Sequence, residues 1–300
     1  MSAVEGQGAV LGGLEQAELP VTRAYRRRRP TARSVSLRAL GVFVVGVLLL
    51  FMIGPILWLA LRAFSGLWQY PQFLPSHWTV KWWSSVFDDK SLGHSIRLSF
   101  EFAPVVTFVS AAICLPAAYA FSRFNFPGRR VLLVSLFATN AFPKIGLYVT
   151  MAGVFYSLNL MGTFLGVVIV QLIGTIVFMT WIPAGAFSAV PRSLEEAARD
   201  VGAGALRVFF RVTFPLAAPG IFVAMILSFL ASFDEAQGTF LVGVPNYITM
   251  PTEMYTLVLN YPEGAAAVFS ILLTIPSIIL MSIARKHVMG GRLAEGFQLR

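Results

Sequence analysis

Long apolar stretches alternate with short polar or basic segments along this chain. A helix that crosses a bilayer core needs about 20 predominantly apolar residues. Six stretches meet or approach that length, at residues 39–61, 99–121, 131–154, 161–185, 215–236 and 264–284. Prolines fall inside or near several of them, which membrane helices tolerate because neighbouring helices satisfy the freed carbonyls. The pattern predicts an all-α integral membrane protein with about six transmembrane helices.

The basic residues gather in alternate segments between the apolar stretches. With the N-terminal segment placed in the cytoplasm, the inner segments are 1–38, 122–130, 186–214 and 285–300, and they hold 18 of the 23 lysines and arginines. Cytoplasmic segments of membrane proteins carry such an excess. The asymmetry predicts a multi-pass protein of the plasma membrane with both termini in the cytoplasm. It also divides the chain into a cytoplasmic tail (1–38), a transmembrane domain (39–285) and a second cytoplasmic tail (286–300).

Composition supports the membrane prediction and argues against a soluble domain and against a nucleic-acid-binding protein. Hydrophobic residues make up 57% of the 300 residues and charged residues only 12%, whereas a soluble domain carries about 25% charge. The net charge of +9 could indicate nucleic acid as a partner, but the cations lie in clusters between apolar runs, which is typical of membrane topology. The single cysteine, Cys114, cannot form an internal disulfide or a zinc site built on cysteines.

The inner segment at residues 191–214 has the pattern of a short helix, a turn and a second helix. Ser193 is followed three residues later by Glu196, which is the spacing of a capping box and predicts Ser193 as the N-cap. Gly202 and Gly204 then permit a sharp turn. Such a helix presents small and acidic side chains that can seat in a groove on another protein. The alternative is an ordinary capped helix in a loop, because capping boxes are common.

The longer pattern of this segment resembles the EAA motif of permease subunits of bacterial ATP-binding-cassette importers. That motif runs E-A-A-x-x-x-G, followed after roughly nine residues by an apolar residue and Leu-Pro; this chain has Glu196-Ala197-Ala198, Gly202 and Phe214-Pro215, with Phe214 in place of the usual leucine. The resemblance implies the type I importer permease fold in the bacterial inner membrane, and a coupling helix that docks in a cleft of the ATPase subunit. The coupling residues it implies are Glu195, Glu196, Ala197, Ala198, Asp200 and Gly202.

Three further motifs bear on the transported solute. Residues 118–129 resemble the A-Y-A-x-x-R-x-x-F-x-G-R connector of the carbohydrate branch, and residues 284–291 resemble its basic, glycine-rich tail. They imply a sugar or sugar-like solute, moved by alternating access, and a partner permease that differs from this chain. Residues 232–235, Ser-Phe-Asp-Glu, instead resemble the S-F-D-[DE] motif of the polyamine branch. A polyamine or another small polar solute is therefore the alternative.

The resemblance also implies the partners: two ATP-binding subunits, a second permease subunit, an extracytoplasmic substrate-binding protein and membrane lipid, but no nucleic acid. We expect no enzymatic activity and no cofactor or metal on this chain, with ATP and Mg²⁺ bound by the ATPase subunits. The sequence contains no G-x-x-x-x-G-K-[ST] phosphate loop, no H-E-x-x-H and no G-x-S-x-G. A secondary carrier that works alone is the alternative from another class, but such carriers usually contain internal repeats, and no convincing repeat is present.

Polar residues in or near the predicted spans are candidates for the substrate path, because polar and ionisable groups at membrane depth tend to face a bundle interior or a watery cavity. The candidates are Asn140, Lys144, Gln171, Asp234 and Glu235. Each has an ordinary alternative: Lys144 can extend to the interface near a span end, Asn140 and Gln171 can bond to a neighbouring helix, and the two carboxylates can be interfacial.

Overall fold

A computed structural model describes residues 32–69, 71–138 and 142–288 of the chain. Within this part the protein is helical, apart from turns and one isolated β-bridge between Ser65 and Trp78, so the all-α prediction is confirmed. The chain divides into two units at Gly54; the described part of the first unit is the beginning of helix α1 (Ala32–Phe64), and the second unit is described below. Residues 1–31 and 289–300, which hold most of the two expected cytoplasmic tails, lie outside the described residues.

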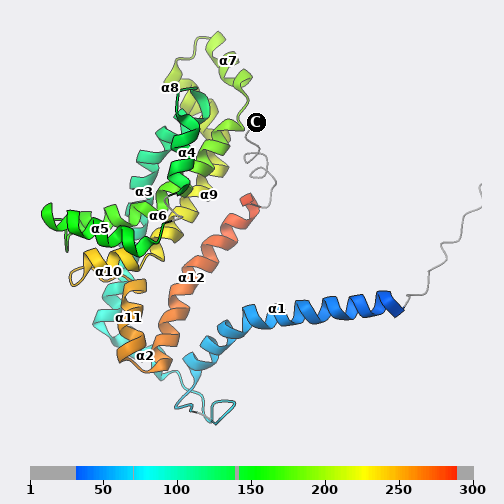
Figure 1. Ribbon diagram of the computed structural model, residues 1–300, viewed down its shortest axis with the longest axis vertical. Coiled ribbons are helices and arrows are strands. Elements are labelled where there is room, and N and C mark those ends of the chain that lie inside the picture. The colour runs from blue at the N-terminus through cyan, green and yellow to red at the C-terminus, as the bar shows by residue number, and fades with distance from the viewer. Residues whose placement is uncertain (1–31, 70, 139–141, 289–300) are drawn as a thin grey trace, which may run out of the picture. The chain divides into compact units, whose positions relative to one another are not determined.

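Helices of very different length follow one another in the second unit (Figure 1). After α1 they are α2 (Lys81–Asp88), α3 (Lys90–Arg123), α4 (Arg129–Ala138), α5 (Lys144–Ser157), α6 (Phe164–Ser188), α7 (Arg192–Asp200), α8 (Ala205–Val208), the π-helical turn η2 (Phe209–Thr213), α9 (Phe214–Phe233), α10 (Gln237–Gly243), α11 (Met250–Asn260) and α12 (Glu263–Val288).

Five helical stretches of the described chain are long and apolar enough to cross a membrane. They are Leu40–Phe64, Lys90–Arg123, Phe164–Ser188, Ala205–Phe233 and Glu263–Arg285. Each contains one of the predicted spans or most of it. Large apolar side chains such as Phe51, Phe108 and Ile278 are exposed along them, as expected for surfaces that contact lipid chains.

The third predicted span, residues 131–154, is not one continuous helix, and this prediction is corrected. It is divided between α4 and α5, with Pro143 immediately before α5. Proline has no N–H and its ring clashes with the preceding helical turn, so a helix usually ends before it. At 1.5 Å per residue, the 10 residues of α4 and the 14 of α5 reach only about 15 and 21 Å, and neither spans a core of about 30 Å alone.

The direction of the neighbouring helices nevertheless requires one crossing between residues 124 and 163. Ser110 of α3 is hydrogen-bonded to Thr175 of α6, and Arg123 at the end of α3 is hydrogen-bonded to Val190 just after α6. Contacts that advance together along both helices mean that α3 and α6 run parallel. The chain must therefore return across the bundle between them, through the segment that contains α4 and α5.

Helices α3, α6 and α9 pack extensively against one another and form the centre of the bundle. Helix α9 runs antiparallel to α6, since Ser232 contacts Gln171 whereas Ser228 contacts Thr175. Gly220 permits a close approach of these two helices, because a side chain there would meet the Cβ of Ala186. Small and hydroxyl-bearing residues thus lie at close contacts between these helices, as is usual between membrane helices.

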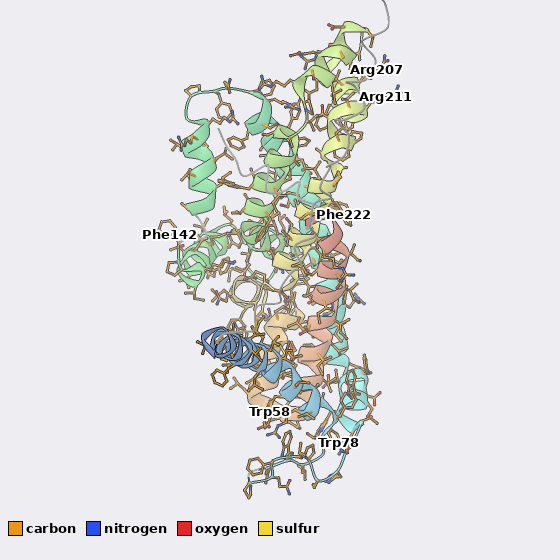
Figure 2. All side chains as sticks on the ribbon, turned by 90° about the vertical axis from the view of Figure 1, so that its right-hand side faces the viewer. Trp58, Trp78, Phe142, Arg207, Arg211 and Phe222 are labelled. Carbon is orange, nitrogen blue, oxygen red and sulfur yellow. The ribbon has the colours of Figure 1, made fainter. Side chains whose placement is uncertain are left out.

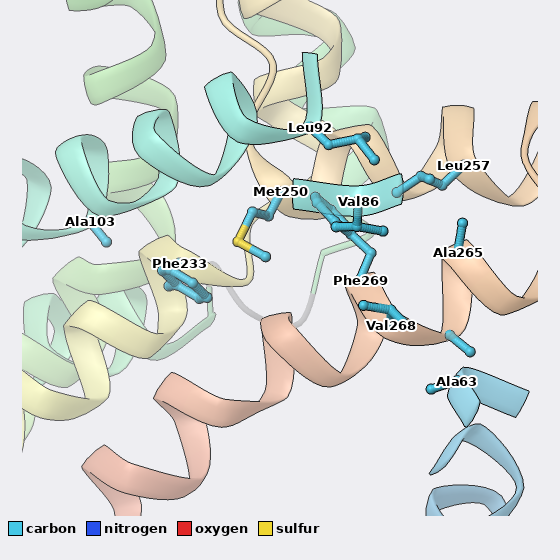
Figure 3. Close-up of a cluster of buried hydrophobic side chains, with 11 residues drawn as sticks. Ala63, Val86, Leu92, Ala103, Phe233, Met250, Leu257, Ala265, Val268 and Phe269 are labelled. Atoms are coloured by element: carbon cyan, nitrogen blue, oxygen red, sulfur yellow. The ribbon is translucent and has the colours of Figure 1, made fainter. Parts of the chain in front are cut away.

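The two ends of the second unit differ in their side chains (Figure 2). Arg207 and Arg211 lie at one end and Trp58 and Trp78 at the other; we call them the basic end and the aromatic end. The aromatic end contains the largest buried apolar cluster, to which Val86, Leu92, Met250, Leu257 and Phe269 contribute from four helices (Figure 3). This cluster fixes α2, α3, α11 and α12 against one another.

Candidate functional site

The helix α7 lies at the basic end, where it joins α6 to the turn before α8 (Figure 1). It begins at Arg192, directly after Pro191, and no side chain caps its first turn. The predicted capping box is therefore wrong, because Ser193 is already inside the helix. Pro191 is the residue before the helix, with a non-helical ψ of 129°, and as a proline it has no N–H that would need a partner there.

The end of α7 depends on Gly202. Its φ is +87°, a left-handed conformation that glycine adopts without steric cost. The amide of Gly202 donates to the carbonyl of Arg199 (2.8 Å) and the amide of Ala203 donates to the carbonyl of Ala198 (3.0 Å). This pair of bonds is the Schellman arrangement at a helix C-terminus. The sharp turn predicted at this glycine is confirmed.

The residues implied by the EAA resemblance divide between the surface and the interior. Glu196, Ala197, Asp200 and Gly202 are exposed and Ala198 is partly buried. Glu195 is buried, with 5% of its surface exposed. One face of α7 is therefore free to contact another protein, while the Glu195 side chain points into this one.

Exposed apolar side chains surround the turn after α7, which the sequence patterns did not indicate. Val201 and Leu206 are exposed over 86% and 76% of their surface, and Leu194 over 46%. A shallow depression beside them is lined by Gly202, Gly204, Ala205, Leu206 and Arg207. Apolar residues grouped on a surface that also carries charged groups are typical of protein interaction sites.

The carboxylate of Glu195 joins three segments of the chain. Its Oε1 accepts a hydrogen bond of 2.7 Å from Nη2 of Arg123, at the end of α3, and another of 2.7 Å from the hydroxyl of Thr213, in η2. The side chains of Arg123 and Glu195 are only 8% and 6% exposed. A buried carboxylate needs such partners, because burying an unpaired charge is costly.

Arg123 also holds the segment that leads into α7. The same Nη2 donates to the carbonyl of Val190 (3.0 Å), and Arg192 donates back to the carbonyl of Arg123 (3.3 Å). Arg123 belongs to the sequence motif at residues 118–129, and Glu195 to the EAA segment. The structure brings these two separately recognised motifs into direct contact, which neither motif indicates by itself.

A second polar network lies between α6, α9 and α10. The hydroxyl of Ser232 donates to Oε1 of Gln171 (2.6 Å), and Nε2 of Gln171 donates to the hydroxyl of Thr239 (3.0 Å). All three side chains are buried. From the sequence, Gln171 can be interpreted either as a substrate-path residue or as a contact between helices. The structure supports the contact between helices, because both ends of the Gln171 amide are hydrogen-bonded within the chain.

Glu235 lies two residues before the short helix α10. Its Oε1 accepts from the amide of Gly238, and its Oε2 accepts from the amide and the hydroxyl of Thr239, each at 2.8 Å. A carboxylate at this position satisfies amides that have no partner within the helix. Glu235 is buried and forms the last acceptor of the network that contains Gln171.

The remaining substrate-path candidates are less constrained. Lys144 is exposed at the first residue of α5, and Asp234 is exposed at the end of α9. Asn140 lies outside the described residues. Among the described residues, no three His, Cys, Asp or Glu side chains are grouped so as to hold a metal ion.

Comparison with known proteins identifies a family. Residues 112–289 match the model of the family described as "Binding-protein-dependent transport system inner membrane component". The match covers more than half of the chain and includes α7, the Gly202 turn and Arg123.

Relatives and a solved structure agree with this match. A putative ABC transporter permease protein of Streptomyces antibioticus is 30% identical over 226 residues, which are 73% of this chain and 97% of the relative. A trehalose transport system permease protein of Mycobacterium tuberculosis is 26% identical over 84% of this chain and 93% of its own length. The crystal structure of a bacterial ABC transporter involved in the import of alginate has a chain with a TM-score of 0.66 at 21% identity, covering 86% of this chain and 99% of that one. At this identity the structural likeness shows the fold, which is that of an importer permease.

Proposed function

Because this chain belongs to the family of binding-protein-dependent transport system inner membrane components, we propose that it is the permease subunit through which an ATP-driven importer moves a sugar or a sugar-like solute. The family match over residues 112–289 carries this proposal. The sugar class is supported by the trehalose permease among the relatives and by the carbohydrate-type motif at residues 118–129.

The exposed face of α7 is the proposed contact for an ATP-binding subunit. Glu196, Ala197, Ala198, Asp200 and Gly202 supply small and charged groups, and Val201 and Leu206 supply exposed apolar surface next to them. Small side chains allow the helix backbone to approach a partner closely, and burial of the apolar pair stabilises the contact. Glu195 supports this helix from the inside, since its carboxylate is already paired.

The ATP that drives transport binds to the partner subunits. This sequence has no phosphate-binding loop of the G-x-x-x-x-G-K-[ST] type, so the proposed role of the chain is mechanical. A substrate-binding protein delivers the solute from outside, and closure of the two ATPases on ATP moves α7. A second permease subunit, different from this chain, completes the path.

Both termini are proposed to lie in the cytoplasm. Five continuous spans and one crossing through α4 and α5 give an even number of passes. The excess of arginine in the segments next to Arg123 and α7 supports a cytoplasmic position for the basic end. This orientation puts α7 where an ATPase can reach it.

The alternative that the solute is a polyamine rests on the Ser-Phe-Asp-Glu sequence at residues 232–235. Its Glu235 is occupied by three hydrogen bonds from Gly238 and Thr239, and Ser232 is bonded to Gln171. Asp234 is the carboxylate of the pair that remains exposed. This arrangement leaves one exposed carboxylate, and not two, to contact a polyamine.

Uptake into vesicles tests the proposal. The chain is reconstituted with its partner permease, ATPase and binding-protein subunits, and uptake of radiolabelled trehalose, maltose and putrescine is measured with and without ATP. ATP-dependent uptake of a disaccharide is the expected result. Uptake of putrescine alone would support the polyamine alternative. Uptake by this chain alone, driven by a proton gradient, would identify a secondary carrier.

A further inference from the structure

We propose that Arg123 and Glu195 are positioning residues that carry the displacement of α7 to α3, a helix with which α7 has no direct covalent connection. The inference rests on the proposed function, because it takes α7 as the contact for the ATPase. The covalent route from α7 leads backwards to α6 and forwards through α8 and η2 to α9. Helix α3 ends 72 residues before Glu195 in the chain.

Arg123 binds the α7 segment at two points, and both charged side chains are buried, unlike those of a surface ion pair. We call this arrangement the clamp. Nη2 of Arg123 donates both to Glu195 within α7 and to the carbonyl of Val190 at its entrance, at 2.7 and 3.0 Å. Both charged side chains are more than nine-tenths buried. The pair is therefore screened little by water or salt, and breaking it without replacement would leave a buried charge exposed to an apolar environment.

The same carboxylate oxygen also binds the other side of the coupling segment. Thr213, which donates to Oε1 of Glu195 at 2.7 Å, belongs to η2 at the start of α9. A single atom thus receives one donor from α3 and one from η2. Because α7 carries the acceptor, a displacement of α7 acts on α3 through Arg123 and on the start of α9 through Thr213.

Helix α3 can pass such a shift to the bundle centre. It packs along α6 and α9, and Ser110, more than three turns before Arg123, is hydrogen-bonded to Thr175 of α6 (3.0 Å). Apolar contacts between Ala118 and Phe187 and Ile221 lie between these two points. Densely packed helices move as rigid bodies and do not deform locally. A displacement at Arg123 therefore moves α3 as far as Ser110, at the centre of the bundle.

Hydrogen–deuterium exchange of the assembled complex tests the proposal without knowledge of the solute. The full complex with its ATPase subunits is compared with and without ATP and vanadate, and exchange is followed in peptides covering residues 112–126 and 192–203. In the wild type we expect both peptides to change. If neither changes, the proposed contact of α7 with the ATPase fails, and the inference fails with it.

Variants distinguish the role of the clamp from the proposed contact of α7 with the ATPase. In Arg123→Gln we expect the peptide of α7 still to respond, while the response of the α3 peptide falls by at least half. Arg130→Gln removes an exposed arginine seven residues after Arg123 and is expected to leave both responses at the wild-type level. Arg123→Lys should keep more of the α3 response than Arg123→Gln, and equal loss in the two would overturn the ion-pair argument.

A wild-type response of the α3 peptide in Arg123→Gln overturns the proposal. Where that variant does not assemble, Glu195→Gln decides, because it removes the charge at nearly unchanged shape. The same selective loss in the α3 peptide is expected there, and an unchanged response would overturn the proposal equally.

Discussion

The guanidinium of Arg123 and the carboxylate of Glu195 form a buried ion pair of 2.7 Å across 72 residues of sequence. The pair connects the end of α3 to the helix proposed to meet the ATPase. Its stability effect should be strongly non-additive. Arg123→Met or Glu195→Leu alone leaves one buried charge without its partner, which costs about 3–5 kcal/mol, whereas an apolar replacement of both is often close to neutral. Thermal unfolding of the purified complex should therefore rank the double variant above each single variant, and additive losses would contradict this account.

Glu196 is exposed beside the buried Glu195, so its substitution should affect docking and not folding. Glu196→Lys is expected to reduce ATP-dependent uptake at least tenfold in reconstituted vesicles, because a reversed charge at an interface repels the complementary charge on the partner. Thermal stability of the isolated subunit should stay within about 0.5 kcal/mol of the wild type, as is usual for exposed positions. Asp88→Lys, an exposed acidic residue of α2 at the aromatic end, is the matched control and should leave coupling intact.

Gly202 and Gly204 provide a matched pair for the turn after α7. A side chain at either position would meet no atom within 4 Å, but Gly202 has a φ of +87° whereas Gly204 has an ordinary φ of −67°. Gly202→Val should strain the backbone by about 1–3 kcal/mol and uncouple ATP hydrolysis from uptake. Gly204 lies in the depression beside the proposed contact, and Gly204→Val should reduce uptake less than Gly202→Val. Equal effects of the two substitutions would mean that the turn geometry is not what matters.

Glu235 and Asp234 are adjacent carboxylates with different surroundings. Glu235→Ala leaves the buried amides of Gly238 and Thr239 without their acceptor, at a cost of about 1–3 kcal/mol for each unsatisfied group. Asp234→Ala removes an exposed side chain and should change thermal stability little. If Asp234 lines the solute path, its variant will instead alter the Michaelis constant for uptake, which measurements over a range of solute concentrations would reveal.

Glu253 lies in α11, outside the five candidate spans, and makes the stability of the fold depend on pH. Burial, with a smaller contribution from the negative charge of Asp89, raises the pKa of its carboxyl above the ordinary value of 4.5. The native state therefore holds a proton that the unfolded chain releases, and this residue's contribution to stability falls as pH rises from about 4.5 through the raised pKa. Glu253→Gln abolishes that dependence, so its thermal stability relative to the wild type should increase between pH 4.5 and 7. A difference that stays constant over this range would contradict the prediction.

Several features could be predicted from the sequence because they depend on local pattern. Apolar length and the distribution of arginine indicated the spans and their direction, and five of the six spans are continuous helices. Gly202 indicated the end of α7, because only glycine readily adopts the conformation needed there. The EAA motif indicated the family, which the match over residues 112–289 confirms.

Other features were decided by contacts between distant segments. The start of α7 at Arg192 and the division of the third predicted span at Pro143 depend on helix geometry that a hydropathy pattern does not record. Gln171 and Glu235 were candidates for the substrate path on sequence alone, but in the structure Ser232, Thr239 and Gly238 are hydrogen-bonded to them.

The sequence by itself determined that this protein is a bundle of membrane helices of a transport family, because hydrophobic length and charge asymmetry act on each segment separately. Only the tertiary structure decided which residue of each motif faces a partner and which is held inside. Glu195 and Glu196 are neighbours of the same chemical type, yet successive helical positions point about 100° apart. One of them meets Arg123 in the interior, and the other remains free on the surface.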